Sequence, residues 1–260
     1  MSAATTPSIT GDRLTRKVRR IAAELPELGR IRHVEANPPS PKAWWITAGF
    51  LLLCTAGVFS DSRSVSGALA VLAAWVMLTW IIMAYLGGEK VVVLDRGLLI
   101  GSFAPFLRPH VVLFSQFEIG SITAVRPGWR VGRMLPGRGM LATGRTAVWA
   151  WNGVAFVAPL GPVARRKWVD ASGFFTAGVE PRMAVLWWFG TWRQPDRLVL
   201  ALESALVDQG YPVAGLSQHV LPMVPISGNP ADAQAQIPRL VAAFQPPGIR
   251  RCLETLYELD

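Results

Sequence analysis

The sequence is poor in cysteine and histidine, and these shortages exclude several classes of protein. Its two cysteines, Cys54 and Cys252, lie far apart and do not form the framework of a disulfide-rich secreted domain. The three histidines, His33, His110 and His219, are scattered, and none has cysteine or carboxylate neighbours at the spacing of a metal site. We therefore expect reduced cysteines and no metal centre.

Charged residues are also scarce, and most of them are basic. Charged residues make up 17% of the chain and hydrophobic residues 51%. Globular chains average about 25% charged residues, so an ordinary soluble domain is not the first expectation. The net charge of +9 favours anionic partners, either nucleic acid or lipid headgroups.

Signatures of catalysis are missing as well. The chain has no P-loop, and no dinucleotide-binding glycine motif follows a predicted strand. Asp95 is expected to stabilise a turn, and Asp196 to complement the dipole at a helix N-terminus. We therefore expect no enzymatic activity, no catalytic residue, no cofactor and no small-molecule substrate.

What the chain does have is two long uncharged runs, residues 43–60 and 64–88. A helix needs roughly 17–25 apolar residues to cross a bilayer, and both runs are long enough. The alternative, two helices buried in a soluble core, is disfavoured because such runs are rare outside membranes. The short connection "DSRSV" predicts an antiparallel transmembrane hairpin over residues 43–88. Four aromatic residues are expected to anchor it at the interface: Trp44, Trp45, Trp80 and Tyr85.

The distribution of basic residues predicts the orientation of this hairpin. Eight lysines and arginines precede the first run, whereas the connection between the runs has only Arg63. The positive-inside rule therefore places both termini in the cytoplasm of a two-span plasma-membrane protein. Neither run contains Asp, Glu, Lys, Arg or His, which argues against the core of a transporter.

Residues 1–42 are interpreted as a basic amphipathic helix followed by a linker. Leu14, Val18, Ile21 and Leu25 recur at helical spacing. The basic residues on the other faces are Arg13, Arg16, Lys17, Arg19 and Arg20. This helix is expected to lie on anionic headgroups or on a partner; the alternative is a helix packed on its own domain. The segment "EANPPSPK" is expected to be a stiff linker.

Residues 89–213 change to the two-residue period of β-strands. "KVVVLDRGLLIGSF" predicts a hairpin with Gly97 in a left-handed loop position, and further strands are expected at 110–117 and 121–125. "TAVWAWNGVAFVAPL" predicts a second hairpin that turns at Asn152-Gly153, followed by a strand at 182–190. A helix is expected from Pro195 to Gly210, with one apolar face formed by Leu198, Leu202, Ala205 and Leu206.

This order of elements, with the opening "LDRGLLI" and the segment "FSQFEIGSITAV", resembles the pleckstrin-homology-like domains of bacteria. The resemblance implies a bent antiparallel sheet or barrel capped by one C-terminal helix, often next to a transmembrane hairpin. The composition, rich in Ala, Arg, Gly, Val and Trp, indicates a high-GC actinobacterial source. Two-span proteins of this kind resemble accessory factors of mammalian-cell-entry lipid-uptake transporters.

One stretch is strongly basic and contains no acid. Between Arg126 and Lys167 tryptophans are interleaved with basic residues, as in single-stranded nucleic-acid sites, lipid interfaces and protein hot spots. The residues expected to contact a partner or lipid are Trp129, Arg130, Arg133, Arg138, Arg145, Arg165, Arg166 and Lys167. The tether to a membrane favours a partner subunit or anionic headgroups over nucleic acid; the alternative is a solvated loop.

Residues 214–260 are expected to be a tail that docks on a partner or on its own domain, because the segment is rich in apolar residues. The leading functional hypothesis is a non-catalytic accessory or scaffold subunit of a larger membrane complex. The competing hypothesis is a membrane-tethered sensor that binds anionic lipid through the Arg- and Trp-rich loop.

Overall fold

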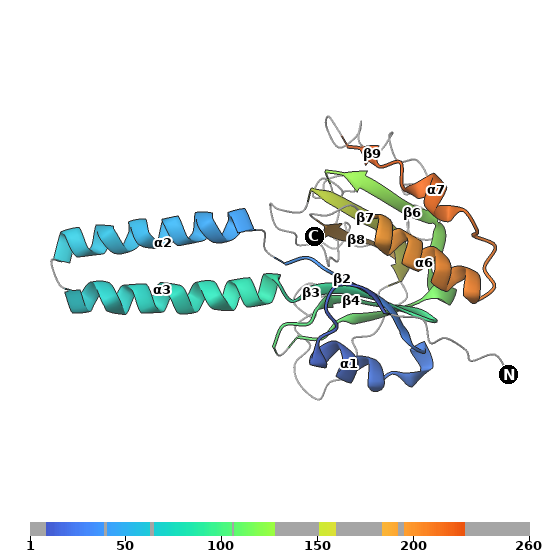
Figure 1. Cartoon of the computed structure of the whole chain (residues 1–260), viewed down its shortest axis with the longest axis horizontal. Coiled ribbons are helices and arrows are strands. Elements are labelled where there is room, and N and C mark those ends of the chain that lie inside the picture. Colours follow the sequence, from blue (N-terminus) through green and yellow to red (C-terminus); the bar gives the residue numbers. More distant parts are fainter. Residues whose placement is uncertain are drawn as a thin grey trace, which may run out of the picture.

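The computed structural model describes residues 9–38, 41–62, 65–105, 107–127, 151–159, 184–191 and 195–226. In these residues two long helices project from a domain built of two mixed β-sheets and shorter helices (Figure 1). The expected combination of an apolar helical hairpin with a mainly β domain is therefore present.

The first sheet has five strands in the order β1-β2-β3-β4-β5. Their bounds are β1 (Thr10–Gly11), β2 (Ile31–Ala36), β3 (Glu89–Leu94), β4 (Gly97–Ser102) and β5 (His110–Leu113). Strands β2 to β5 pair antiparallel, and β1 is added in parallel at the β2 edge. The strand expected over 110–117 ends early, since Phe114–Gln116 forms the 3₁₀ turn η2.

The second sheet has four strands in the order β8-β7-β6-β9. Their bounds are β6 (Glu118–Arg126), β7 (Asn152–Pro159), β8 (Ala184–Thr191) and β9 (Val224–Pro225). The predicted strands at 121–125 and 182–190 correspond to β6 and β8. Asn152 and Gly153, expected to form a hairpin turn, lie inside β7 instead, opposite Thr191 and Gly190 of β8. The turn prediction was wrong because an Asn-Gly pair also fits a strand where neighbours on both sides supply hydrogen bonds.

The helices that cover these sheets are α1 (Arg16–Ala23), the 3₁₀ turn η1 (Pro26–Leu28), α6 (Asp196–Asp208) and α7 (Leu216–Val220). Helix α6 matches the predicted one: Leu198, Leu202, Ala205 and Leu206 are buried, and Gly210 ends it at a φ of 84°. Beyond it, Glu203 accepts backbone hydrogen bonds from Gly215 and Ser217, which holds α7 against α6. The tail as far as Ile226 therefore docks on its own domain, and residues 227–260 lie outside the described part.

Both faces of the first sheet are buried, which explains why its strands are continuous apolar runs. Val91 and Val93 belong to the core shared with the second sheet and α6. Val92 and Leu94 belong to a separate core with α1. The domain therefore has three layers, with α1 on one side of the first sheet and the second sheet with α6 on the other (Figure 1).

The N-terminal segment is part of this domain, which differs from the expected boundaries at residues 42 and 89. Strand β2 pairs with β3, so that Val34 lies opposite Val92. Thr15 caps α1 by accepting a hydrogen bond from the Val18 amide, and Val18 and Ile21 are 0% and 1% exposed. The segment expected to be a linker begins inside β2. Asn37, the first residue after β2, is buried.

The two long helices, α2 (Pro41–Ser62) and α3 (Val65–Leu86), leave the domain after β2 and return to it at β3. Both are long enough and apolar enough to cross a membrane. Their surfaces are exposed apolar side chains, such as Trp45 at 79% and Leu53 at 72%. Phe50 and Trp75 meet edge to face at 6.3 Å between ring centroids, so the two helices pack side by side. The expected pair of long apolar helices is therefore present, and it is inserted between two neighbouring strands.

Candidate functional site

A groove of about 1190 Å³ lies beside the β1 edge of the first sheet. Its walls are β1 and the end of α1 on one side and α6 on the other, with the start of β2 and Asp95 at its base. Three arginines line it, Arg30, Arg32 and Arg197. Because small-molecule pockets usually measure roughly 300–1,000 Å³, this groove is larger than a typical one.

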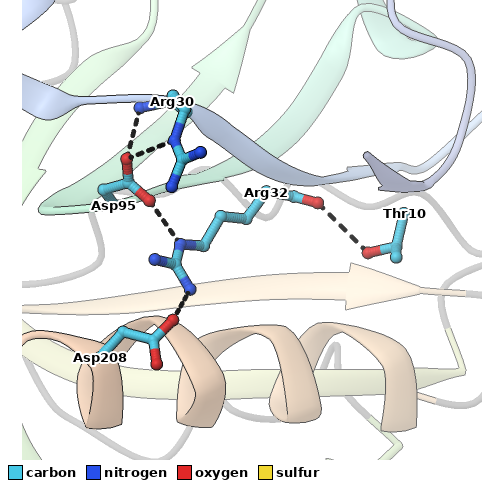
Figure 2. Close-up of polar contacts among 5 residues, drawn as sticks. All are labelled: Thr10, Arg30, Arg32, Asp95 and Asp208. Atoms are coloured by element: carbon cyan, nitrogen blue, oxygen red, sulfur yellow. Dashed lines mark hydrogen bonds and ion pairs between the residues drawn. The ribbon is translucent and has the colours of Figure 1, made fainter. Parts of the chain in front are cut away.

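A polar network beside the groove joins β1, β2, the turn between β3 and β4, and α6 (Figure 2). Asp95, in the turn between β3 and β4, accepts hydrogen bonds from the Arg30 amide at 2.7 Å and from Arg32 Nε at 2.6 Å. The same Arg32 guanidinium donates to Asp208 at the end of α6. Thr10 Oγ1 of β1 donates to the Arg32 carbonyl at 3.3 Å. Arg32 therefore ties the sheet edge to α6.

This network shifts the pKa values of its members. Burial alone would raise the pKa of Asp95, but the hydrogen bonds from Arg30 and Arg32 and their charges hold it below its ordinary value. Burial opposes the charge of Arg32, yet hydrogen bonds to Asp208 and Asp95 leave its pKa raised. The carboxylate and the guanidinium are thus both charged at neutral pH.

We expect Asp95→Asn to lower the free energy of unfolding by about 1–2 kcal/mol at neutral pH, because it removes charge-assisted hydrogen bonds at a side chain that is 15% exposed. The folded-state pKa of Asp95 is lowered, so its contribution is present above the unfolded pKa and is lost as pH falls through the folded pKa. The difference between the proteins should therefore disappear in acid. Denaturant unfolding of the full chain over this pH range measures it.

The matched control is Glu118→Gln, which neutralises an exposed carboxylate and should change stability by less than about 0.5 kcal/mol. A deficit of Asp95→Asn that persists unchanged in acid would mean that the carboxylate charge is not what stabilises the turn.

A buried polar row lies next to the groove, under β1. His33 is 0% exposed and lies opposite Thr10 in the parallel pairing of β1 with β2. Thr10 Oγ1 is 2.9 Å from His33 Nδ1, and His33 Nε2 is 3.0 Å from Glu35 Oε2. The row gives the buried histidine a partner on each ring nitrogen and fastens the short strand β1.

The basic helix predicted to lie on the membrane corresponds to α1 and the three residues before it. Arg13, Arg16 and Arg19 are exposed, and Arg20 pairs with Glu24 at 3.4 Å. Lys17 donates to the carbonyls of Ala104 and Leu107, in the connection between β4 and β5. The apolar face of α1 is occupied by the sheet, so only the basic face remains exposed.

The other predicted site residues fall in two groups. Trp44 and Trp45 lie in the first turn of α2, and Trp80 and Tyr85 lie towards the end of α3, so all four are near the domain end of the hairpin. The eight candidate contact residues of the Arg- and Trp-rich stretch lie outside the described residues: Trp129, Arg130, Arg133, Arg138, Arg145, Arg165, Arg166 and Lys167.

Sequence reasoning missed the groove and the buried row. The groove forms from four segments that are far apart in the chain, at residues 9–11, 22–32, 95 and 197–204, and no local sequence pattern predicts that they meet. The His33–Glu35 pair did have a signal, because residues two apart in a strand share a face. That signal required β2 to be recognised as a strand.

Within the part of the chain that the structure describes, no group of three His, Cys, Asp or Glu side chains is placed to hold a metal ion. The groove offers guanidinium groups and apolar surface to a ligand. Comparisons of the chain with protein-family models, with curated proteins and with solved structures find no significant match.

Proposed function

We propose that this chain is a two-span plasma-membrane protein and a non-catalytic accessory or scaffold subunit of a larger membrane complex. Its β domain is of the pleckstrin-homology-like kind and lies in the cytoplasm with both termini. A lipid-uptake transporter of the mammalian-cell-entry type is the assembly to which the sequence resemblance points. The partners are other membrane-protein subunits.

The order of elements supports the pleckstrin-homology-like assignment once β2 is counted. Strands β2 to β5 form one antiparallel series, β6 to β8 form another, and α6 follows. Helix α6 then packs into the core between the two sheets through Leu198 and Leu202. A bent sheet closed by a C-terminal helix has this sequence of elements, with the membrane hairpin inserted between its first two strands.

The observation that carries the scaffold function is that both ends of the hairpin are attached to the β domain by backbone hydrogen bonds. The Asn37 amide bonds to the Glu89 carbonyl at 3.3 Å, and the Phe103 amide bonds to the Gly88 carbonyl at 2.7 Å. Both ends of the hairpin thus enter paired strands rather than a loose linker. A domain fastened in this way keeps one orientation to the bilayer, which suits a subunit that positions its neighbours.

Purification of the tagged full chain from its native membranes in a mild detergent tests the scaffold function. Stoichiometric subunits that remain with the chain through size-exclusion chromatography are the expected result. A chain that elutes alone, and floats with anionic but not with neutral liposomes, would contradict it and favour the lipid sensor.

The lipid sensor stays as a second candidate because of one specific observation. Lys17 binds the connection between β4 and β5, and Phe103 at the start of that connection bonds to Gly88 next to the hairpin. The exposed Arg13 and Arg16 are therefore near the domain end of the hairpin, where each basic residue attracts anionic headgroups by about 1 kcal/mol.

The proposed topology predicts the accessibility of two engineered cysteines. In a background without Cys54 and Cys252, Ser62→Cys should react in intact cells with a membrane-impermeant maleimide, because Ser62 ends α2 at the end of the hairpin that is proposed to lie outside. Gln209→Cys should react only after permeabilisation. Gln209 is exposed on the domain, so its protection would report the compartment and not burial. Reaction of both positions, or of Gln209→Cys alone, in intact cells would overturn the topology.

A further inference from the structure

The groove lies at the end of the domain away from the membrane hairpin. Strand β2 ends at Ala36, which pairs with Lys90 next to the hairpin, whereas Arg30 precedes the other end of the strand. At about 3.3 Å per residue, six residues of strand separate the two ends by roughly 20 Å. Figure 1 shows the hairpin, α2 and α3, projecting from one side of the domain. This placement favours a cytosolic ligand over the headgroup layer.

One wall of the groove has the spacing of a helix-packing surface. Arg197, Leu200, Ala201 and Ser204 of α6 line it at intervals of three, one and three residues, which places them in one stripe. This stripe differs from the buried face of α6, and Leu200 is 51% exposed. Across the groove, Ala22 and Ala23 of α1 are small enough for the backbone of a ligand to come close.

The charge of the groove is positive after its internal pairs are counted. Arg32 is engaged by Asp95 and Asp208. The side chain of Arg30 makes only a long ion pair with Asp95, at 3.5 Å from Nε to Oδ2, and it is 65% exposed. Arg197 is exposed and makes no ion pair with any described residue. Two guanidinium groups are thus presented at the walls of an otherwise largely apolar groove, where they can bind carboxylates with paired hydrogen bonds.

From these features we infer that the groove is the docking site for an acidic amphipathic helix of a cytosolic partner segment. The apolar face of that helix packs on Leu200 and Ile9, and its glutamates or aspartates pair with Arg30 and Arg197. The volume of about 1190 Å³ exceeds that of most small-ligand sites, which favours a polypeptide segment. The inference rests on the proposed scaffold function, because it names the chemistry of the partner that the scaffold holds.

Three designed helical peptides of equal length and with one shared apolar face serve as probes. Their polar faces carry glutamate, glutamine or lysine. Each is titrated, by fluorescence anisotropy, against the full chain in phosphatidylcholine nanodiscs. We expect the glutamate peptide to bind about tenfold or more tightly than the lysine peptide, with an affinity that falls as salt is raised. Equal binding of all three peptides would overturn the inference.

Variants then locate the binding site. Arg30→Glu combined with Arg197→Glu should weaken the glutamate peptide about tenfold or more and strengthen the lysine peptide. Arg19→Glu combined with Arg20→Glu makes the same change of charge outside the groove lining and should have little effect. Leu200→Gln tests the apolar contact, with Val207→Gln, elsewhere on α6, as its control. If the Arg19 and Arg20 double variant loses the glutamate peptide and the Arg30 and Arg197 double variant does not, the peptide binds another surface and the inference is overturned.

Other occupants give different results, each of which contradicts the inference. A synthetic peptide of residues 249–260 that binds the groove more tightly than the glutamate peptide would identify a tail of this chain. Displacement of the glutamate peptide by lysophosphatidic acid at lower concentration would identify a lipid. A dimer dissolved by the groove variants would identify a second copy.

The inference and the proposed function fail separately. If subunits co-purify with the chain and the groove variants leave that complex intact, the scaffold function stands and the groove assignment is wrong. If the chain purifies alone but the glutamate peptide binds as expected, the proposed scaffold function is wrong and the groove assignment stands.

Discussion

Gly97→Ala and Gly97→Asn should each lower the free energy of unfolding by about 2–3 kcal/mol, with asparagine no better than alanine. A Cβ atom at Gly97 would lie 2.5 Å from the carbonyl oxygen of Val112 and 3.3 Å from Leu28 Cδ2. The first contact is with backbone of the neighbouring strand β5, which cannot turn aside as a flexible side chain can. Strand β5 must therefore shift, and the pairing of Gly97 with Leu113 is disturbed.

Gly210 is the matched control, because its backbone conformation, and not a close neighbour, favours glycine there. Its φ is 84°, and a Cβ there would meet nothing within 4 Å. Asparagine tolerates left-handed backbone better than alanine, so Gly210→Asn should be milder than Gly210→Ala, which should cost about 1 kcal/mol. Denaturant unfolding of the full chain compares the four variants. Rescue by asparagine at Gly97 as well would mean that backbone conformation, and not the approach of β5, requires glycine there.

The two glycines show what local sequence predicts and what it does not. The "LDRGLLI" segment predicted a hairpin with Gly97 in a left-handed loop position, and β3 and β4 are that hairpin. The reason given for the glycine was wrong, because the turn is Asp95-Arg96 and Gly97 is the first residue of β4. Its constraint comes from β5, which returns only after the next connection. A sequence pattern reports conformation along the chain, whereas contacts between strands depend on the tertiary fold.

The same limit explains the missed strand β2. It pairs with β3 across residues 37–88, and no local sequence period predicts a partner on the far side of two long helices. A signal was nevertheless present in Val91, Val92, Val93 and Leu94. A strand that is apolar at every position needs cover on both faces, and one layer of further strands supplies only one. The helix that supplies the other is α1.

The elements with strong local patterns were predicted, and the site that several elements share was not. Helix α6 has a proline at its start, a glycine beyond its end and one apolar stripe, all of which are visible in the sequence. The second stripe of α6, which lines the groove, mixes arginine, leucine, alanine and serine, and it has no distinctive composition. Its significance depends on α1 and β1 facing it.

Ile21→Asp should lower the free energy of unfolding by about 4 kcal/mol, or should detach α1 from the sheet. Ile21 is 1% exposed in the core with Val92 and Leu99. The substitution loses the packing of a buried isoleucine, about 2–5 kcal/mol in comparable truncations, and it places an unpaired carboxylate in an apolar layer. Urea unfolding of the full chain in phosphatidylcholine nanodiscs, followed by tryptophan fluorescence, measures the change.

Two controls separate packing from membrane contact. Arg19→Asp introduces the same side chain on the exposed face of α1 and should change stability by less than about 0.5 kcal/mol. Repeating both variants in nanodiscs that contain anionic lipid should leave the result for Ile21→Asp unchanged, because its partners are the valines and leucines of the sheet. A helix that lay on the bilayer through Ile21 would behave differently. The substitution would then leave domain stability intact in neutral nanodiscs and reduce only the attraction to anionic ones. That outcome would return α1 to the membrane surface and leave the outer face of β3 and β4 without the cover that their continuous apolar sequence requires.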